Sequence, residues 1–196
     1  MVPVLRDRVQ AMAEGGDEVT FRHPLTHCGW PPPNASPLTM IRLVGGDSRD
    51  AVADRLRYAS DVLGDPPRTR PGNSANYSNA DYVLAAAMLE ARTGRSWSWL
   101  MEEELFEPLG LRSAGFGPPG SVDSLDALRG HSNSWFGLGG LRAGAPDFSA
   151  DNPPTRGPAG RVHMSLSDYA IFLVDQLRGP RGEGVLLPAE EYPRAD

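Results

Sequence analysis

Apolar residues in this sequence gather in a few segments with helical spacing, and long stretches rich in proline and glycine separate them. The clearest segment lies within residues 76–94, where a polar turn leads into a helix with so few polar positions that we expect it to be largely buried. Ser78 or Asn79 can cap its N-terminus, and Ser78-x-x-Asp81 has the form of a capping box. Gly94 follows the last turn, where a left-handed glycine commonly ends a helix. The pattern therefore predicts this helix as the central element.

Two more helices are predicted on either side of it. The first is capped by Ser48 and ends before Gly64, with Val52, Ala53 and Leu56 on its inner face. The second lies between Ser96 and Pro108 and has apolar residues at helical spacing, namely Trp97, Leu100, Met101 and Leu105. Residues 4–12 form a weaker amphipathic segment, either a short helix or an extended lead-in.

A last helix is predicted from the capping box Ser165-x-x-Asp168 to Gly179. We expect its buried face to consist of Leu166, Ala170, Leu173, Val174 and Leu177. Strand signals are sparse, and residues 37–44 are one candidate. Residues 112–163 form a long irregular stretch, in which Trp135 and Phe136 favour packing over disorder. Three consecutive prolines at 31–33 predict an extended loop, because each fixes φ and removes a donor.

Composition and charge narrow the class of protein. The 196 residues are 40% hydrophobic and carry a net charge of -6, which fits a soluble globular protein and argues against a nucleic-acid partner. No run of about 18 apolar residues occurs, so no membrane span is expected. All 19 basic residues are arginine, and the chain contains no lysine.

Neither cysteine nor the first residues assign a compartment. Cys28 is the only cysteine, so it cannot form an internal disulfide. The sequence begins without a charged region followed by an apolar one, so no signal peptide is visible. Localisation therefore stays unknown.

Candidate chemistry lies at the start of the longest helix, where Tyr77 and Asn79 flank Ser78. A phenol held there has a fixed direction and lies near the partial positive charge of the helix terminus, which stabilises a nearby negative charge. Such a tyrosine is suited to act as a general base. The alternative interpretation is that Tyr77 packs and donates one hydrogen bond while Asn79 merely caps the helix.

Tyr77-Ser78-Asn79 resembles the Tyr-x-Asn motif of the serine β-lactamase-like hydrolases, which include class C β-lactamases, D-alanyl-D-alanine peptidases and related esterases. Residues 105–111, Leu-Phe-Glu-Pro-Leu-Gly-Leu, are similar to the family's Phe-x-Pro-Leu-Gly-Met segment. Residues 21–27, Phe-Arg-His-Pro-Leu-Thr-His, are similar to Leu-Arg-x-Leu-Leu-x-His, and residues 158–168 give a fourth match. The four matches follow the family's order and cover most of residues 19–190.

This resemblance implies an α+β fold: the mostly helical subdomain of a β-lactamase/penicillin-binding-protein-like fold, with most of the flanking antiparallel sheet missing. Residues 1–196 would be a single partial domain. The family's nucleophile is the serine of a Ser-x-x-Lys motif upstream, and only 22 residues precede His23. The third motif, Lys/His-x-Gly on a C-terminal strand, is expected beyond Asp196.

The function implied is that of a β-lactamase-related serine hydrolase, typically bacterial and often exported, that acts on a small amide or ester. Tyr77 would be the catalytic general base that shares a proton with the missing lysine, and Asn79 would hydrogen-bond substrate or lysine. Loss of the nucleophile costs on the order of a million-fold in turnover, so we expect this chain alone to be inactive. Gly72-Asn73-Ser74-Ala75-Asn76 is no substitute, since it lacks the second glycine of Gly-x-Ser-x-Gly.

Two alternatives from other classes stay open. The chain could be a non-catalytic binding or interaction module derived from that family. It could also be a gene fragment without a stable fold, because half a core leaves the faces of Leu89, Leu100 and Leu173 exposed.

The remaining motifs predict neither a cofactor nor a metal. Residues 115–120 fit Gly-x-Gly-x-x-Gly, but two prolines remove N–H groups that would face a pyrophosphate. His23, His27 and Cys28 could suggest a metal, yet Pro24 works against a helix that aligns the two rings. His27 is expected to make a structural hydrogen bond. His131 and His163 are interpreted as structural, and Trp97, Trp99 and Trp135 as core residues.

Overall fold

The computed structural model describes residues 3–10, 12–29, 50–67, 70–120, 128–133, 141–144 and 151–192. The chain divides into two compact units. The first contains Met1–Trp97 and Asn152–Arg161, and the second contains Ser98–Asp151 and Val162–Asp196. Four predicted features lie outside the described residues: the proline loop at 31–33, the strand at 37–44, the Ser48 cap, and packing of Trp135 and Phe136.

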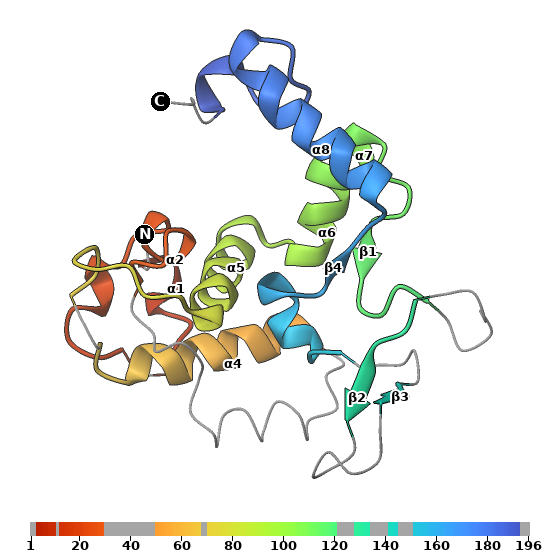
Figure 1. Ribbon diagram of the computed structural model, residues 1–196. Helices are drawn as coiled ribbons and strands as arrows, with labels where there is room; N and C mark the ends of the chain where they lie inside the picture. The colour runs from red at the N-terminus through yellow and green to blue at the C-terminus, as the bar shows by residue number, and fades with distance from the viewer. Residues whose placement is uncertain are drawn as a thin grey trace. The chain divides into compact units, whose positions relative to one another are not determined.

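The first unit is built around α5 (Asn79–Thr93). The elements α1 (Pro3–Arg6), α2 (Arg22–Leu25), α4 (Ala51–Gly64) and the 3₁₀ helix η4 (Pro154–Ala159) pack against it, and Figure 1 shows α5 lying across α4. A further 3₁₀ turn, η1, covers Gly16–Glu18. Because η4 comes from a segment far along the chain, this unit is discontinuous in sequence.

α5 is as buried as its sequence predicts. The core of the first unit joins its apolar residues to those of α4 and to two residues near the N-terminus: Leu5, Val19, Tyr58, Ala59, Val62, Leu63, Ala80, Val83, Leu84, Ala87 and Met88. Tyr82 is the exception among the apolar residues of α5, since 37% of it is exposed. Ser78 is the cap, with its hydroxyl accepting from the Asp81 N–H at 3.3 Å, and Gly94 ends the helix at φ 71°.

α4 begins later than predicted. Its first residue is Ala51, and the cap is Asp50, whose Oδ1 accepts from the Ala53 N–H at 3.0 Å. An aspartate is an equally good acceptor for the free N–H groups of a first turn, so the apolar spacing alone could not choose between Ser48 and Asp50.

In the second unit a continuous helical segment follows α6 (Trp97–Met101), which begins at the boundary between the units. A π-helical turn covers Glu102–Phe106, and α7 covers Glu107–Leu109. The prediction that Pro108 ends this helix is wrong. Pro108 lies in the first turn of α7, where proline is tolerated, and Gly110 at φ 66° ends the segment.

Two short antiparallel ladders also belong to the second unit. β1 (Gly115–Phe116) pairs with β4 (Val162–His163), placing Gly115 opposite His163. β2 (His131–Asn133) pairs with β3 (Leu141–Ala143), placing His131 opposite Ala143. The described chain is thus mostly helical with little sheet.

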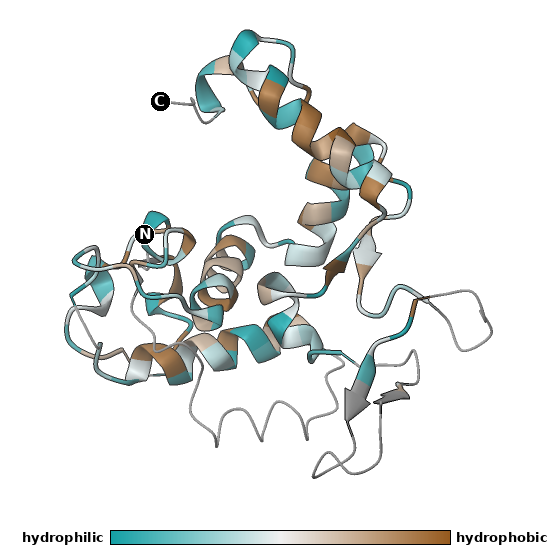
Figure 2. Ribbon diagram, in the orientation of Figure 1, coloured by the Kyte–Doolittle hydropathy of each residue, from teal (hydrophilic) through white to brown (hydrophobic). Residues whose placement is uncertain are grey.

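α8 (Leu166–Arg178) has the predicted cap, since the Ser165 hydroxyl accepts from the Asp168 N–H at 3.2 Å. The prediction that the apolar face of this helix is buried is wrong. Leu166 is 83% exposed and Leu177 is 74% exposed, and Ala170, Leu173 and Val174 are also exposed. Figure 2 shows hydrophobic residues along this helix. The periodicity identified an apolar stripe correctly, but a stripe is buried only where another element packs on it.

The turns after α8 pack on Tyr192. This ring lies against Gly179, the first residue of the 3₁₀ turn η5 (Gly179–Arg181), where a Cβ would overlap the ring. The Tyr192 hydroxyl donates to Asp175 Oδ2 at 2.9 Å, and the 3₁₀ turn η6 (Ala189–Glu191) leads into Tyr192.

None of the described helices combines the length and the apolar character required to cross a bilayer.

Candidate functional site

Tyr77 and Asn79, the two predicted site residues, are brought together at the start of α5. The Tyr77 hydroxyl donates to Asn79 Oδ1 at 3.2 Å. Tyr77 is 68% exposed, whereas Ser78 between them is fully buried as the helix cap. A phenol and an amide therefore stand on a fixed turn, with the phenol open to solvent.

His27 forms hydrogen bonds to this turn through both its backbone and its ring. Its backbone is left-handed, with φ 55°, and its carbonyl accepts from the Asn76 N–H at 2.8 Å. The ring nitrogen Nδ1 accepts from the Ser78 N–H at 3.2 Å, so the predicted structural hydrogen bond of His27 is present. The imidazole also contacts the rings of Tyr77 and Tyr82, with centroids 4.7 and 5.3 Å away. His27 thus sets both the backbone and the ring position of Tyr77.

Asp81 completes the site, although the sequence pattern indicated only a capping role for it. Its carboxyl group is 1% exposed, and Oδ2 lies 3.8 Å from His27 Nδ1. Among the described residues, Oδ1 has no hydrogen-bond partner. It lies against Gly29, where a Cβ would overlap it. Burial raises the pKa of Asp81 to about 7.

The capping box that the spacing predicts is therefore half formed. The Ser78 hydroxyl caps the Asp81 N–H, but the return bond from the Ser78 N–H goes to His27 instead of the Asp81 carboxyl. A partner 51 residues away in sequence leaves no trace in the local spacing. The signal that could have indicated it was an acidic residue inside an otherwise apolar helix.

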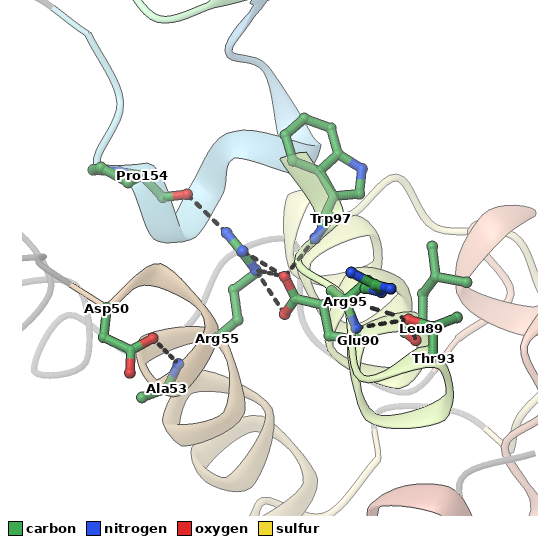
Figure 3. A network of polar contacts seen from close by, with 9 residues as sticks. All are labelled: Asp50, Ala53, Arg55, Leu89, Glu90, Thr93, Arg95, Trp97 and Pro154. Atoms are coloured by element: carbon green, nitrogen blue, oxygen red, sulfur yellow. Dashed lines mark hydrogen bonds and ion pairs between the residues drawn. The ribbon is translucent and has the colours of Figure 1, made fainter. Parts of the chain in front are cut away.

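A buried ion pair fixes the far end of α5. Arg55 of α4 binds Glu90 at 2.5–3.0 Å, and both side chains are almost fully buried. Figure 3 shows the guanidinium between Glu90 and the Pro154 carbonyl, to which it donates at 3.0 Å. Glu90 also accepts from the Trp97 N–H at 2.8 Å. The helix that carries the site is thus joined to α4, η4 and Trp97.

The other sequence candidates take structural places. His23 Nδ1 accepts from the Thr20 N–H at 3.2 Å, and His163 Nδ1 lies 2.8 Å from the Gly117 carbonyl. His131 lies exposed on β2. Within the part of the chain that the structure describes, no group of three His, Cys, Asp or Glu side chains could hold a metal ion.

The arrangement can accept or share a proton at an exposed phenol oxygen and offer an amide beside it. It contains no lysine, because the chain has none. Together, the buried α5 with Tyr-x-Asn at its start and the loop at His27 define a protein of the serine β-lactamase/penicillin-binding-protein-like fold.

The sequence matches the Beta-lactamase family over residues 4–194, and the chain belongs to this family. It is 29% identical over 148 residues to penicillin-binding protein 4 of Amycolatopsis lactamdurans, covering 74% of this chain and 36% of that protein. It is 28% identical over 129 residues to a D-aminopeptidase of Brucella anthropi, covering 59% of this chain and 25% of that protein.

Among solved structures, a D-stereospecific amidohydrolase from Streptomyces sp. superposes with a TM-score of 0.67 at 21% identity, over 96% of this chain and 54% of that one. The predicted fold, a partial α+β domain of this type, is confirmed. The chain spans about a third or less of the two curated relatives and about half of this structural neighbour.

Proposed function

We propose that these residues are the helical part of a β-lactamase-related serine hydrolase, in which Tyr77 acts as the general base and Asn79 binds the substrate or a catalytic lysine. The observation that carries the proposal is the exposed Tyr77 hydroxyl, held against Asn79 at 3.2 Å on a turn that His27 and Ser78 fix. Family membership supports the proposal, because Tyr77-Ser78-Asn79 resembles the family's Tyr-x-Asn motif. This turn stands at the start of the buried helix α5.

The chemistry is acyl transfer. A serine oxygen attacks the carbonyl carbon of the substrate, its proton passes to the Tyr77 oxygen, and the leaving amine or alcohol takes up a proton as the acyl–serine ester forms. Water then cleaves that ester by the reverse sequence of proton transfers. The Asn79 amide N–H₂ can donate to a carbonyl oxygen of the substrate, or its oxygen can orient a lysine ammonium.

A serine and lysine spaced as Ser-x-x-Lys do not occur among these 196 residues, so other residues must supply them. We propose that the chain alone does not turn over. The substrate class we propose is a small amide of a D-amino acid, since relatives in sequence and in structure are named D-aminopeptidase and D-stereospecific amidohydrolase.

The first test is to read the DNA for about 300 bases on either side of this reading frame. If Ser-x-x-Lys and Lys/His-x-Gly appear, the longer protein should hydrolyse D-amino acid amides, and Tyr77→Phe should slow its acylation about 10²- to 10⁴-fold. Tyr169→Phe, an exposed tyrosine on α8, is the matched control and should leave the acylation rate unchanged. Unchanged burst kinetics in Tyr77→Phe would remove Tyr77 from the role.

The lack of lysine favours one alternative, a non-catalytic binding module. If the chain is such a module, its 196 residues should unfold cooperatively and take no covalent label from a fluorophosphonate or a penicillin. The DNA should then contain no reading frame that extends this one with the two missing motifs.

A further inference from the structure

The turns after α8 surround one phenol, that of Tyr192, which is only 3% exposed. Its hydroxyl donates to Asp175 Oδ2 at 2.9 Å. The same oxygen accepts from the backbone N–H groups of Leu186 and Leu187, at 3.0 and 3.1 Å. The surroundings therefore supply an acceptor for the phenol proton and two donors for the phenol oxygen, which together use the whole hydrogen-bonding capacity of a hydroxyl.

Asp175 keeps partners of its own besides the phenol. This residue of α8 is 5% exposed, and its Oδ1 accepts from the Val185 N–H at 2.6 Å. The Gln176 side-chain amide donates to Oδ2 at 3.3 Å. Burying a carboxylate costs free energy unless donors meet its oxygens, so Oδ2 favours a neighbour that brings an O–H.

Two glycines give the phenol ring a flat seat. A Cβ at Gly179 would overlap the ring of Tyr192, and a Cβ at Gly184 would overlap the hydroxyl end of the same ring. A Cβ at Gly184 would also lie 2.7 Å from the Gly179 Cα. The missing side chains at both positions therefore leave a slot that a flat ring fills.

Residues 188–192, called the strap below, reach this slot with one attachment. Among the described residues, every hydrogen bond from the strap to the rest of its unit passes through the Tyr192 hydroxyl. Pro188, Glu190 and Glu191 are exposed. A segment attached by one side chain can leave while α8 stays folded, because few contacts have to break.

We propose that the C-terminal end of α8 carries a binding site for small para-substituted phenols, which the chain's own Tyr192 fills in this structure. The two glycines select a flat ring, and Asp175 with the two backbone N–H groups selects its hydroxyl. An aryl group without a hydroxyl would leave these polar groups without their partner, and sites of this kind reject such analogues strongly. Tyr192 enters through the ring carbon opposite its hydroxyl, so a substituent is tolerated at that position.

The strap competes with any free phenol for the site. A tethered side chain has a high effective concentration, so the wild-type site is closed to free ligands at concentrations that would fill it otherwise. Removal of the Tyr192 side chain opens the site and leaves Asp175, the two glycines and the backbone N–H groups in the chain.

The test is to add para-cresol, which is the tyrosine side chain as a free molecule, to the Tyr192→Ala variant of the 196-residue chain. Hydrogen exchange at the Leu186 and Leu187 amides reports occupancy. At saturation we expect para-cresol to slow both amides by about tenfold, because each regains an acceptor. Toluene has the same ring and methyl group without the hydroxyl, and it should slow them by less than about twofold. Wild type should not respond to para-cresol.

Further variants separate a built site from a general effect of the added phenol. In Tyr192→Phe the ring still fills the slot, so both amides should exchange about tenfold faster than in wild type and para-cresol should not slow them. Gly184→Ala added to Tyr192→Ala places a Cβ where the hydroxyl lies, and the response to para-cresol should disappear. Gly130→Ala in the same background is the matched control, and the response should persist there.

Three results would overturn the proposal. Equal slowing by para-cresol and toluene would show an apolar cavity that does not recognise a hydroxyl. A response that survives Gly184→Ala would place the ligand elsewhere. No slowing by para-cresol in Tyr192→Ala would exclude the site even if the turns after α8 unfold in this variant, because a site built for a phenol must regain its structure when the phenol is supplied. None of these measurements involves hydrolysis.

Discussion

The Asp81 carboxyl is enclosed between His27 and Gly29, and one of its oxygens lacks a partner among the described residues. The folded chain keeps this proton up to about pH 7, whereas the ordinary value for an aspartate is 3.8. Between these two pH values this carboxyl holds a proton in the folded state that it has released in the unfolded state. The contribution of Asp81 to the free energy of unfolding therefore falls as the pH rises through this window.

Asp81→Asn removes this dependence, because the amide resembles the neutral carboxyl and never ionises. We expect the variant to gain on the order of 1–3 kcal/mol over wild type at about pH 8 and close to nothing at about pH 4. Urea denaturation at both pH values measures the difference. Asp7→Asn is the control, and an equal gain at the two pH values would contradict the assignment.

Gly29 is required by the contact with Asp81. A Cβ at this position would overlap Asp81 Oδ1, so Gly29→Ala should destabilise the first unit by about 1–3 kcal/mol. In an Asp81→Gly background, Gly29→Ala should cost much less than in the wild type, because the carboxyl that the new Cβ would overlap is gone. Gly130→Ala is the neutral comparison in thermal unfolding, because no atom of the described residues lies within 4 Å of a Cβ added there. Additive losses in the double variant would show that the contact is not the cause.

At the residue scale, local chemistry could be predicted and distant partners could not. The Ser78 cap follows from a neighbour three positions away, whereas the hydrogen bond from Tyr77 to Asn79 was not predicted. The acceptor of the Ser78 N–H comes from His27, and only the folded loop brings it near.

At the scale of elements, the Arg55–Glu90 pair holds α4, α5 and η4 in one arrangement (Figure 3). Both charges are buried, so each depends on the other to offset its loss of hydration. The pair fixes the positions of these elements, because its hydrogen bonds also reach the Pro154 carbonyl and the N–H of Trp97.

Glu90→Gln should lower the free energy of unfolding by about 3–5 kcal/mol, because it leaves the Arg55 guanidinium buried without an anion. The double variant Arg55→Met with Glu90→Met should lose less than the single one. Denaturation midpoints measure both. Arg6→Met, which breaks an exposed pair with Asp17, is the control and should cost at most about 1 kcal/mol. A loss in Glu90→Gln no larger than this control would contradict the role of the pair.

The helices themselves were predictable, because caps and apolar spacing are local properties. α5 and the start of α8 begin where their caps predict. The exposed apolar face of α8 was not predictable, since spacing shows which face is apolar and not what covers it. Pro108 was misjudged because a π-helical turn before it let a new first turn begin.

At the scale of the whole molecule, the four family motifs predicted the fold class, and the structural neighbours confirm it. They did not predict the division into two units, with Asn152–Arg161 returning to complete the first. That return depends on contacts across about a hundred residues, such as the one from Arg55 to Pro154.

Two shortened chains test this return. A chain ending at residue 161 keeps every segment of the first unit, whereas a chain ending at residue 151 lacks η4 and the Pro154 carbonyl. We expect hydrogen exchange in α5 to be slow in the longer of the two and markedly faster in the shorter. Equal protection in both would show that residues 152–161 do not complete the unit.

The discontinuity of the first unit also matters while the protein is being made. After residue 97 leaves the ribosome, the 64 residues from 98 to 161 must follow before the unit is complete, which takes roughly 3–13 s at usual translation rates. During that interval the part of the nascent α5 that η4 contacts is uncovered and open to chaperones and proteases, although α1, α2 and α4 have already been made. The yield of folded protein should therefore respond to translation speed across residues 98–161 more than to speed anywhere before them.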